Sequence, residues 1–218
     1  MRTDNGPRRT GAGRPMGPQP AKRQAILEAA VAVFLREGYT RAGVDVIADE
    51  AGVSKQTVYN HFGDKERLFI AAVEGERERV AAAFADGAPY APEQFDGDAR
   101  AVLIAFGHRV LEVLLDERAS ALRRLVIAEV ARHPSLRTAC SDGEPQRLVV
   151  WLTGMLDRRT VSGELSVPDP ASAAQQFVAL LVQQGLYQSM YGTRPLAAEI
   201  AASICEKAAD LFVRAYRT

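Results

Sequence analysis

The chain has 218 residues, 47% of them hydrophobic, and its 27 basic and 27 acidic side chains cancel to a net charge of zero. This length is enough for one large domain or two small ones with a full hydrophobic core. The sequence has no run of about eighteen apolar residues, which excludes a membrane-spanning helix, and its N-terminus lacks the apolar segment of a secretory signal. We therefore expect a cytoplasmic globular protein.

The cysteines and histidines show no spacing typical of a metal site or a disulfide framework. Cys140 and Cys205 lie far apart in the sequence, and His61, His108 and His133 are scattered. Free thiols are typical of a reducing compartment. The chain also has no Gly-rich phosphate loop, no HExxH motif and no paired nucleophile and base. We therefore expect no metal, no cofactor and no enzymatic activity.

Residues 1–20 are rich in Gly, Pro and Arg, have no apolar periodicity and are expected to be disordered. Over residues 1–42, eight basic side chains stand against three acidic ones, although the whole chain is neutral. This basic end indicates where a polyanion such as DNA would bind. The first twenty residues are either a solubilising tail or a basic arm that reaches along DNA phosphates, and their composition leaves both readings open.

Two helices are predicted next, over residues 21–37 and 45–51. Glycines follow both segments, and Gly38 and Gly52 should end them because glycine tolerates a positive φ angle. The inward-facing residues of the first helix are Ile26, Ala30, Val33 and Phe34. Those of the second are Val46, Ile47 and Ala51.

A further short helix is predicted to begin after Ser54, which is a good N-cap, and to end before Gly63. Val58 and Phe62 are four residues apart and share a face that must point into the domain. The opposite face and its flanks carry polar groups suited to base edges and phosphates. These are Lys55, Gln56, Thr57, Tyr59 and Asn60.

The rest of the chain is divided by helix breakers and has no strand pattern and no internal repeat. Helices are predicted over 65–86, 98–116 and 120–132. Another begins near residue 134 and breaks around 141–145, and the next continues to about 159. The last two are predicted over 170–192 and 196–216. Residues 87–97 and 161–170 are expected to be loops, and Asp169 should cap the helix that has Pro170 in its first turn. The sequence therefore predicts an all-α protein of about nine or ten helices.

The region from residue 23 to residue 66 closely resembles the DNA-binding signature of the TetR family of transcriptional regulators. Residues 23–39 match the first helix of that family, and the segments AGVS, TVYNHF and DKE follow in the same order and spacing. The segments SALRRLVIAEVARHPSL and DPASAAQQFVALLVQQGL resemble, more loosely, its regulatory domain. The resemblance implies a three-helix DNA-binding domain over 21–80 with a helix-turn-helix at 43–62, and a regulatory and dimerisation domain over 81–218.

The resemblance also implies which residues meet double-stranded DNA. Lys55, Gln56, Thr57 and Asn60 would face the bases. Thr40, Ser54, Tyr59, His61 and Lys65 would hold the backbone, together with the N–H groups that follow Gly43. One short helix reads only about three or four base pairs, so we expect a homodimer on a palindromic operator.

Two apolar faces near the C-terminus are candidates for the dimer interface, although both could instead close the core of the monomer. The first is the stripe Ile200, Ile204, Ala208 and Leu211, beside the small residues Ala197, Ala198, Ala201 and Ala202. The second is formed by Phe177, Leu180, Leu181 and Tyr187. Two helices from each subunit would then form a four-helix interface.

A ligand cavity is expected among the central helices. Its candidate lining residues, each of which could be plain core or surface, are Phe106, His108, Trp151, Met155, Gln184 and Tyr187. A mostly apolar cavity selects a small, partly apolar effector. We therefore expect a repressor that such an effector releases from DNA. The alternatives are a regulator without a small-molecule ligand and a transcriptional activator.

Overall fold

The computed structural model describes residues 19–85, 97–137 and 145–217. Within these ranges it contains nine α-helices, one short 3-10 helix and no strand beyond the isolated bridge between Leu165 and Arg217. The all-α prediction is therefore confirmed. None of the described helices combines the length and apolarity that crossing a membrane requires. The expected N-terminal tail and most of the 87–97 loop lie outside the described residues, as does most of the break at 141–145.

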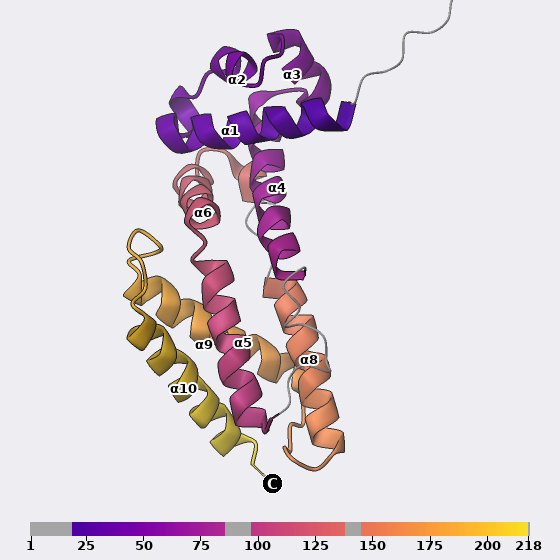
Figure 1. Ribbon diagram of the computed structural model, residues 1–218, viewed down its shortest axis with the longest axis vertical. Coiled ribbons are helices and arrows are strands. Elements are labelled where there is room, and N and C mark those ends of the chain that lie inside the picture. Colours follow the sequence, from indigo (N-terminus) through magenta and orange to yellow (C-terminus); the bar gives the residue numbers. More distant parts are fainter. Residues whose placement is uncertain (1–18, 86–96, 138–144, 218) are drawn as a thin grey trace, which may run out of the picture.

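Three helices form one end of the elongated molecule (Figure 1): α1 (Gln19–Arg41), α2 (Val44–Glu50) and α3 (Lys55–Phe62). Gly38 interrupts α1 with a φ of 78°, so the predicted break occurs there, and one further turn then leads to Arg41. Phe34, Ile47 and Val58 meet in the shared core of these helices. We call this end, residues 19–62, the reading head.

Two helices connect the reading head to the rest of the molecule: α4 (Lys65–Ala85) and α6 (Glu117–Glu129). Leu68, Phe69 and Ala72 of α4 are buried in the core of the reading head, as expected for the helix that follows it. The same core also contains Leu122 and Val126 of α6, and Leu136 of the 3-10 helix η2 (Pro134–Arg137). Segments sixty or more residues further along the chain thus complete the hydrophobic core of the reading head.

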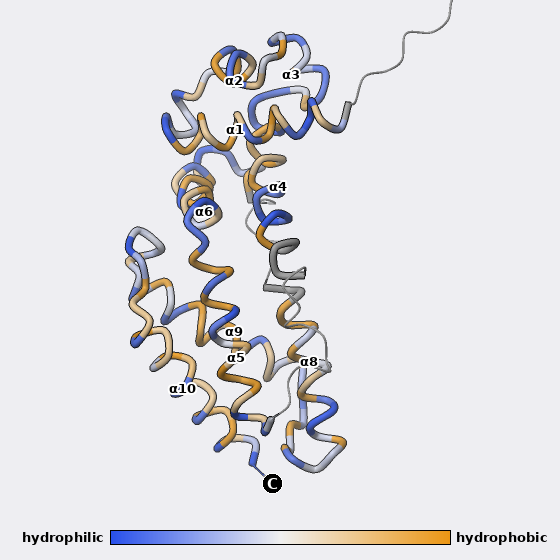
Figure 2. Tube along the Cα trace, in the orientation of Figure 1, coloured by the Kyte–Doolittle hydropathy of each residue, from blue (hydrophilic) through white to orange (hydrophobic). Residues whose placement is uncertain are grey.

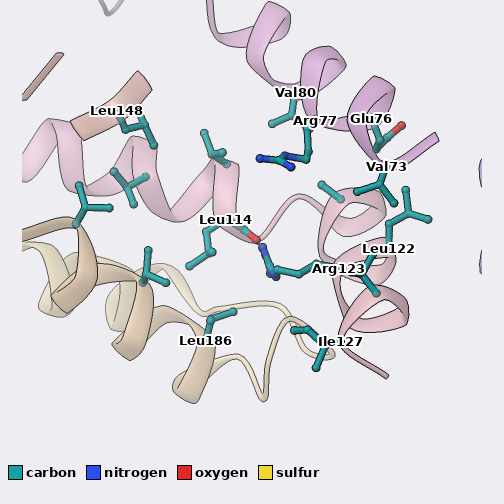
Figure 3. Close-up of a pocket in the computed structure, with 16 residues that line it drawn as sticks. Val73, Glu76, Arg77, Val80, Leu114, Leu122, Arg123, Ile127, Leu148 and Leu186 are labelled. Carbon is teal, nitrogen blue, oxygen red and sulfur yellow. Dashed lines mark hydrogen bonds between the residues drawn. The ribbon is translucent and has the colours of Figure 1, made fainter. Parts of the chain in front are cut away.

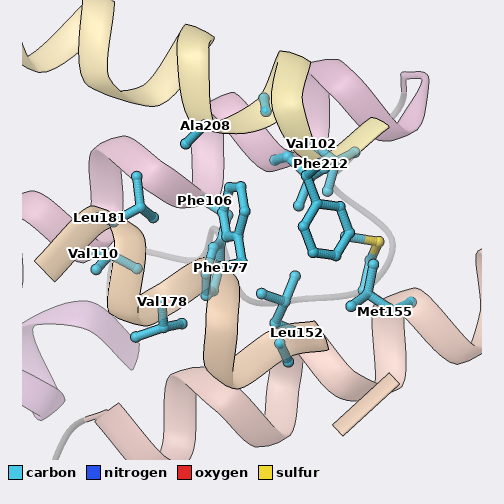
Figure 4. Packing of buried hydrophobic residues seen from close by; sticks show 14 of the residues in the cluster. Val102, Phe106, Val110, Leu152, Met155, Phe177, Val178, Leu181, Ala208 and Phe212 are labelled. Atoms are coloured by element: carbon cyan, nitrogen blue, oxygen red, sulfur yellow. The ribbon is translucent and has the colours of Figure 1, made fainter. Parts of the chain in front are cut away.

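The opposite end consists of α5 (Ala99–Leu114), α8 (Pro145–Val161), α9 (Pro170–Gln188) and α10 (Ala198–Ala215). Hydrophobic residues are concentrated along α5, which lies between the other helices (Figure 2). Phe106 of α5 and Phe177 of α9 lie at the centre of this second core, with Leu152 of α8 and Phe212 of α10 beside them (Figure 4).

Aspartate caps fix several helix starts in this part of the chain. The carboxylates of Asp98, Asp116 and Asp169 each accept a hydrogen bond from the backbone N–H three residues on. The cap at Asp169 was predicted. Because Asp116 caps α6, this helix begins at Glu117, three residues before the predicted start. The residues after Gln188 form a turn in which Gly192 N–H donates to Ser189 Oγ, so α9 is shorter than the predicted helix 170–192.

The two predicted interface stripes are only partly on the surface, so neither can form the predicted interface as a whole. On α10, Ile204 and Ala208 are buried in the monomer core, whereas Ile200 and Leu211 are exposed. Four-residue steps along an α-helix advance by about 40°, so the stripe turns from the surface into the core. On α9, Phe177 and Leu181 are likewise core residues.

Candidate nucleic-acid interface and ligand cavity

The turn between α2 and α3 is formed as its sequence predicts. Gly52 has a φ of 65°, and Ser54 Oγ accepts a hydrogen bond from Thr57 N–H at 3.1 Å as the N-cap of α3. Val58 and Phe62 are almost fully buried against the rest of the reading head. Two well-anchored apolar residues thus fix which side of α3 faces outward.

The outward side of α3 carries the residues predicted to read bases. Lys55, Gln56 and Asn60 are exposed, and Thr57 is half-buried because its hydroxyl contacts Ser54 Oγ at 2.8 Å. Gln56 Nε2 donates to Asn60 Oδ1 at 2.9 Å, one helical turn away. This bond orients both amides and leaves the Gln56 oxygen and the Asn60 NH₂ group to face a partner.

The predicted backbone-contacting residues lie around this face at different depths. Tyr59 is 38% exposed and His61 is half-buried at the end of α3. Gly43 is the N-cap of α2 and has no side chain to occupy the first N–H groups of that helix. These groups are therefore available to an anion such as a phosphate.

Thr40 and Lys65 make contacts within the protein that the sequence did not reveal. Lys65 Nζ donates to the Thr40 carbonyl at 3.0 Å and lies over the Tyr39 ring, 5.0 Å from its centre. Partial burial lowers the pKa of Lys65. The Thr40 hydroxyl donates to Glu129 Oε1 at 3.4 Å. Both residues thus help attach the reading head to α4 and α6.

The first turn of α4, directly after the reading head, also contacts the α6–η2 region through Glu66. Ser135 Oγ donates to one oxygen of Glu66, and His133 Nδ1 lies 3.7 Å from the other. The His133 ring also packs edge-on against Tyr39. No local pattern predicts these contacts, because they join residues more than sixty positions apart.

A cavity of about 320 Å³ lies between α4, α5, α6, α8 and α9 (Figure 3). Most of its lining is aliphatic, and three charged residues, Glu76, Arg77 and Arg123, complete it. Among the aliphatic residues are Val80, Val113, Leu148, Val182 and Leu186. This volume is at the lower end of the range for small-molecule sites, about 300–1,000 Å³.

None of the six residues predicted to line a ligand cavity lines this one, so that prediction is wrong for it. Phe106 and Met155 are core residues, and Phe106 stacks on Trp151 with ring centres 5.2 Å apart. Tyr187 is 67% exposed on the outer side of α9. Gln184 is half-buried but does not reach the cavity, and His108 lines a separate, more polar hollow beside the α9–α10 turn.

The cavity and the hydrophobic core of the reading head share three residues, which come from α4 and α6. Val73 of α4 and Leu122 and Val126 of α6 line the cavity and also belong to the hydrophobic core of the reading head. A change in the cavity that displaces either helix would therefore disturb the packing beneath α1–α3.

Family models match both ends of the chain. Residues 26–72 match the model described as "Bacterial regulatory proteins, tetR family". Residues 101–218, more than half of the chain, match the model described as "AefR-like transcriptional repressor, C-terminal domain". The chain belongs to the TetR family of transcriptional regulators. These matches support DNA-binding regulation of transcription by this TetR-family protein.

Similar proteins agree with that assignment. The activator FasR of Mycolicibacterium smegmatis is 46% identical over 57 residues, which are 26% of each chain. This TetR-family protein therefore matches only about a quarter of the length of that relative. A TetR-family regulator from Mesorhizobium loti has a solved structure with a TM-score of 0.79 and 27% identity, covering 92% of this chain and 100% of its own. The flavonoid-responsive regulator FrrA has a TM-score of 0.72 and 26% identity, covering 90% of this chain and 97% of its own.

Proposed function

We propose that this protein is a ligand-responsive repressor that binds a palindromic operator as a homodimer and leaves it when a small, partly apolar effector occupies the cavity. The observation that carries the proposal is the set of three residues, Val73, Leu122 and Val126, which belong to both the cavity lining and the core of the reading head. The three parts of the proposal, DNA reading, dimerisation and effector response, rest on different features.

For DNA reading, we propose that α3 lies in the major groove. Its outward side offers Lys55, Gln56 and Asn60, and a groove of B-DNA accepts one α-helix. Tyr59, His61 and the N–H groups after Gly43 would hold phosphates on either side. Bidentate contact of a Gln or Asn amide is suited to adenine, so Gln56 and Asn60 are the residues proposed to specify bases.

For dimerisation, we propose that the outer sides of α9 and α10 meet those of a second copy. Exposed apolar residues lie on these helices and in the turn between them, namely Tyr187 of α9, Met190 and Tyr191 of the turn, and Ile200 and Leu211 of α10. Ile200 and Leu211 are three helical turns apart on one side of α10. A two-fold dimer places two reading heads on the two halves of a palindrome.

For effector response, we propose that the occupied cavity separates α4 from α6 and thereby moves the reading head. A ligand changes an equilibrium only by its different affinity for the two states, and a cavity that widens in the released state provides that difference. The similarity to the flavonoid-responsive regulator FrrA supports a small-molecule effector. The repressor description of the model over residues 101–218 supports repression over activation.

The test is a binding assay on DNA selected by the protein itself from a random library. A diverse set of small molecules is first screened for those that raise the melting temperature of the protein. These compounds should weaken DNA binding measured by fluorescence anisotropy. The variant Val182→Phe, which fills the cavity, should no longer bind them. A regulator without a ligand would show no compound that both binds and changes DNA affinity.

A further inference from the structure

We infer that the effector is an amphipathic organic anion, with an apolar body in the aliphatic part of the cavity and a carboxylate bound by Arg123. This inference rests on the proposed function and adds the chemical class of the ligand. It is carried by the different hydrogen-bond and ion-pair partners of two charged residues that line the cavity, Arg123 and Glu76.

Arg123 is a cation of the cavity lining that keeps hydrogen-bond donors for an anion. Its side chain is half-buried, and Nη2 donates to the Leu114 carbonyl at 2.9 Å. Within the described part of the chain no carboxylate pairs with it, and burial together with the neighbouring Arg124 lowers its pKa. A guanidinium has five N–H donors and stays charged, so Arg123 retains donors for a second acceptor.

The acidic residue of the cavity lining, Glu76, is neutralised by two arginines that do not line the cavity, Arg79 and Arg118. Glu76 is only 4% exposed, and its Oε1 accepts from Arg79 at 2.6 to 2.8 Å and lies 3.4 Å from Arg118. Arg79 in turn bonds both oxygens of Asp116. Glu76 therefore does not attract a cationic ligand into the cavity.

The cavity consequently presents positive charge at one place and apolar surface elsewhere. Arg123 turns toward the space between α4, α5 and α6, where it meets the Leu114 carbonyl (Figure 3). Aliphatic residues of α8 and α9, among them Leu148, Val178 and Val182, form the far wall. A carboxylate would form charge-assisted, bidentate bonds with a guanidinium, and its apolar body would displace water from that wall.

A neutral or cationic ligand fits this arrangement less well. A cation would meet Arg123 without a free carboxylate to offset the repulsion, because Glu76 is held by two arginines. A neutral ligand would cover the guanidinium and remove its water without replacing the charge interaction. Only an anion both fills the cavity and satisfies Arg123.

The test compares acids with neutral molecules of the same shape. Decanoate and naphthoate are titrated by calorimetry beside decanol and naphthalenemethanol, with the full-length protein and with Arg123→Gln. We expect at least one acid to bind more tightly than its alcohol, and Arg123→Gln to weaken that acid about 10- to 100-fold while leaving the alcohol unchanged.

Two further variants make the result specific. Arg124→Gln removes the same charge one residue along α6, where the guanidinium donates instead to the Gly192 carbonyl at 2.6 Å, and it should keep acid binding within about twofold. Val182→Phe should abolish binding of acids and alcohols alike. Three outcomes would overturn the inference. They are equal binding of acid and alcohol, equal effects of the two arginine variants, and no binding of either acid.

Release of the protein from selected DNA distinguishes failure of the anion inference from failure of the proposed effector response. If the alcohols release DNA as well as the acids do, the anion inference fails and the proposed effector response stands. If compounds bind in the cavity and DNA affinity never changes, the proposed response fails, whatever the charge of the compound.

Discussion

The Thr40 hydroxyl donates a hydrogen bond to Glu129 Oε1 at 3.4 Å, which joins the end of α1 to the last residue of α6. The Thr40 carbonyl meanwhile accepts a hydrogen bond from Lys65 of α4 at 3.0 Å. One residue of the reading head is therefore attached to both helices that run from the cavity. The sequence predicts Thr40 as a phosphate contact. A movement of α4 or α6 would therefore shift a residue that is proposed to bind DNA.

Glu129→Ala should weaken the link between effector and DNA without weakening effector binding. Its carboxylate is 13% exposed and bonds Thr40, so its removal detaches the end of α6 from the reading head. The coupling free energy is calculated from the ratio of the DNA affinities without and with a releasing compound. We expect this coupling free energy to fall by about 0.5–2 kcal/mol. Anisotropy measures this ratio, with the exposed Glu78→Ala on α4 as the control. An unchanged ratio would show that Glu129 takes no part in coupling.

Gln56→Ala and Tyr59→Phe should affect DNA binding in different ways. Gln56 lies exposed on the outward side of α3, so its loss should relax discrimination at one base position of each half-site by about 1–3 kcal/mol. The Tyr59 hydroxyl is proposed to hold a phosphate, so its loss should weaken all sequences alike. Binding curves on operator variants separate these patterns. A uniform loss for Gln56→Ala would mean that its role is misassigned.

Deletion of residues 1–18 should leave folding and dimerisation intact and weaken DNA binding modestly at low salt. This segment contains Arg2, Arg8, Arg9 and Arg14 against Asp4 alone, next to the reading head in sequence. Attraction between such a segment and phosphates falls as salt rises. The affinities of truncated and full-length protein should therefore converge with increasing salt. Equal affinities at low salt would identify the segment as a solubilising tail only.

Cys205 should be unreactive in the native protein. Its thiol is fully buried, and burial, followed by the nearby Glu206, raises its pKa to about 11. At pH 8 roughly one thiol in a thousand would be ionised, and only the thiolate reacts quickly. In a Cys140→Ser variant, Ellman's reagent should therefore label no thiol until urea is added. Rapid labelling of the native variant would contradict this environment.

The same ionisation gives a stability prediction with a definite sign. The folded-state pKa of Cys205 is above its ordinary value of 9.0, so the fold favours the protonated thiol. This contribution to the free energy of unfolding is complete below about pH 9 and is lost as pH rises toward 11. Cys205→Ser should remove this part of the alkaline decline in urea denaturation curves.

The local chemistry of single residues made much of the fold predictable from the sequence. Gly38 and Gly52 adopt the positive φ angles that their positions implied, and Ser54 and Asp169 cap the helices expected to follow them. Val58 and Phe62 are buried because a four-residue spacing places both on one side of α3. Such signals depend only on near neighbours in the chain, so they can be identified without knowing how the helices cross.

The cavity could not be predicted in this way, because its lining comes from five helices whose crossings the sequence does not encode locally. Phe106 and Met155 are large apolar residues of central helices, and their size favours the core over a cavity wall. Arg123 lies next to the buried Leu122 on α6, and nothing in the surrounding pattern distinguishes it from a surface arginine. Its place at the cavity follows only from the packing of α6 against α4 and from its bond to the Leu114 carbonyl at the end of α5.

Selection of bound sequences from a random DNA library, followed by sedimentation of the complex, tests the central claim most directly. We predict enriched inverted repeats whose half-sites lie about one helical turn apart, with two chains on each duplex. Scrambling one half-site should then sharply weaken binding. Enrichment of a single unrepeated site, or one chain on each duplex, would contradict a dimer that reads DNA through two copies of α3.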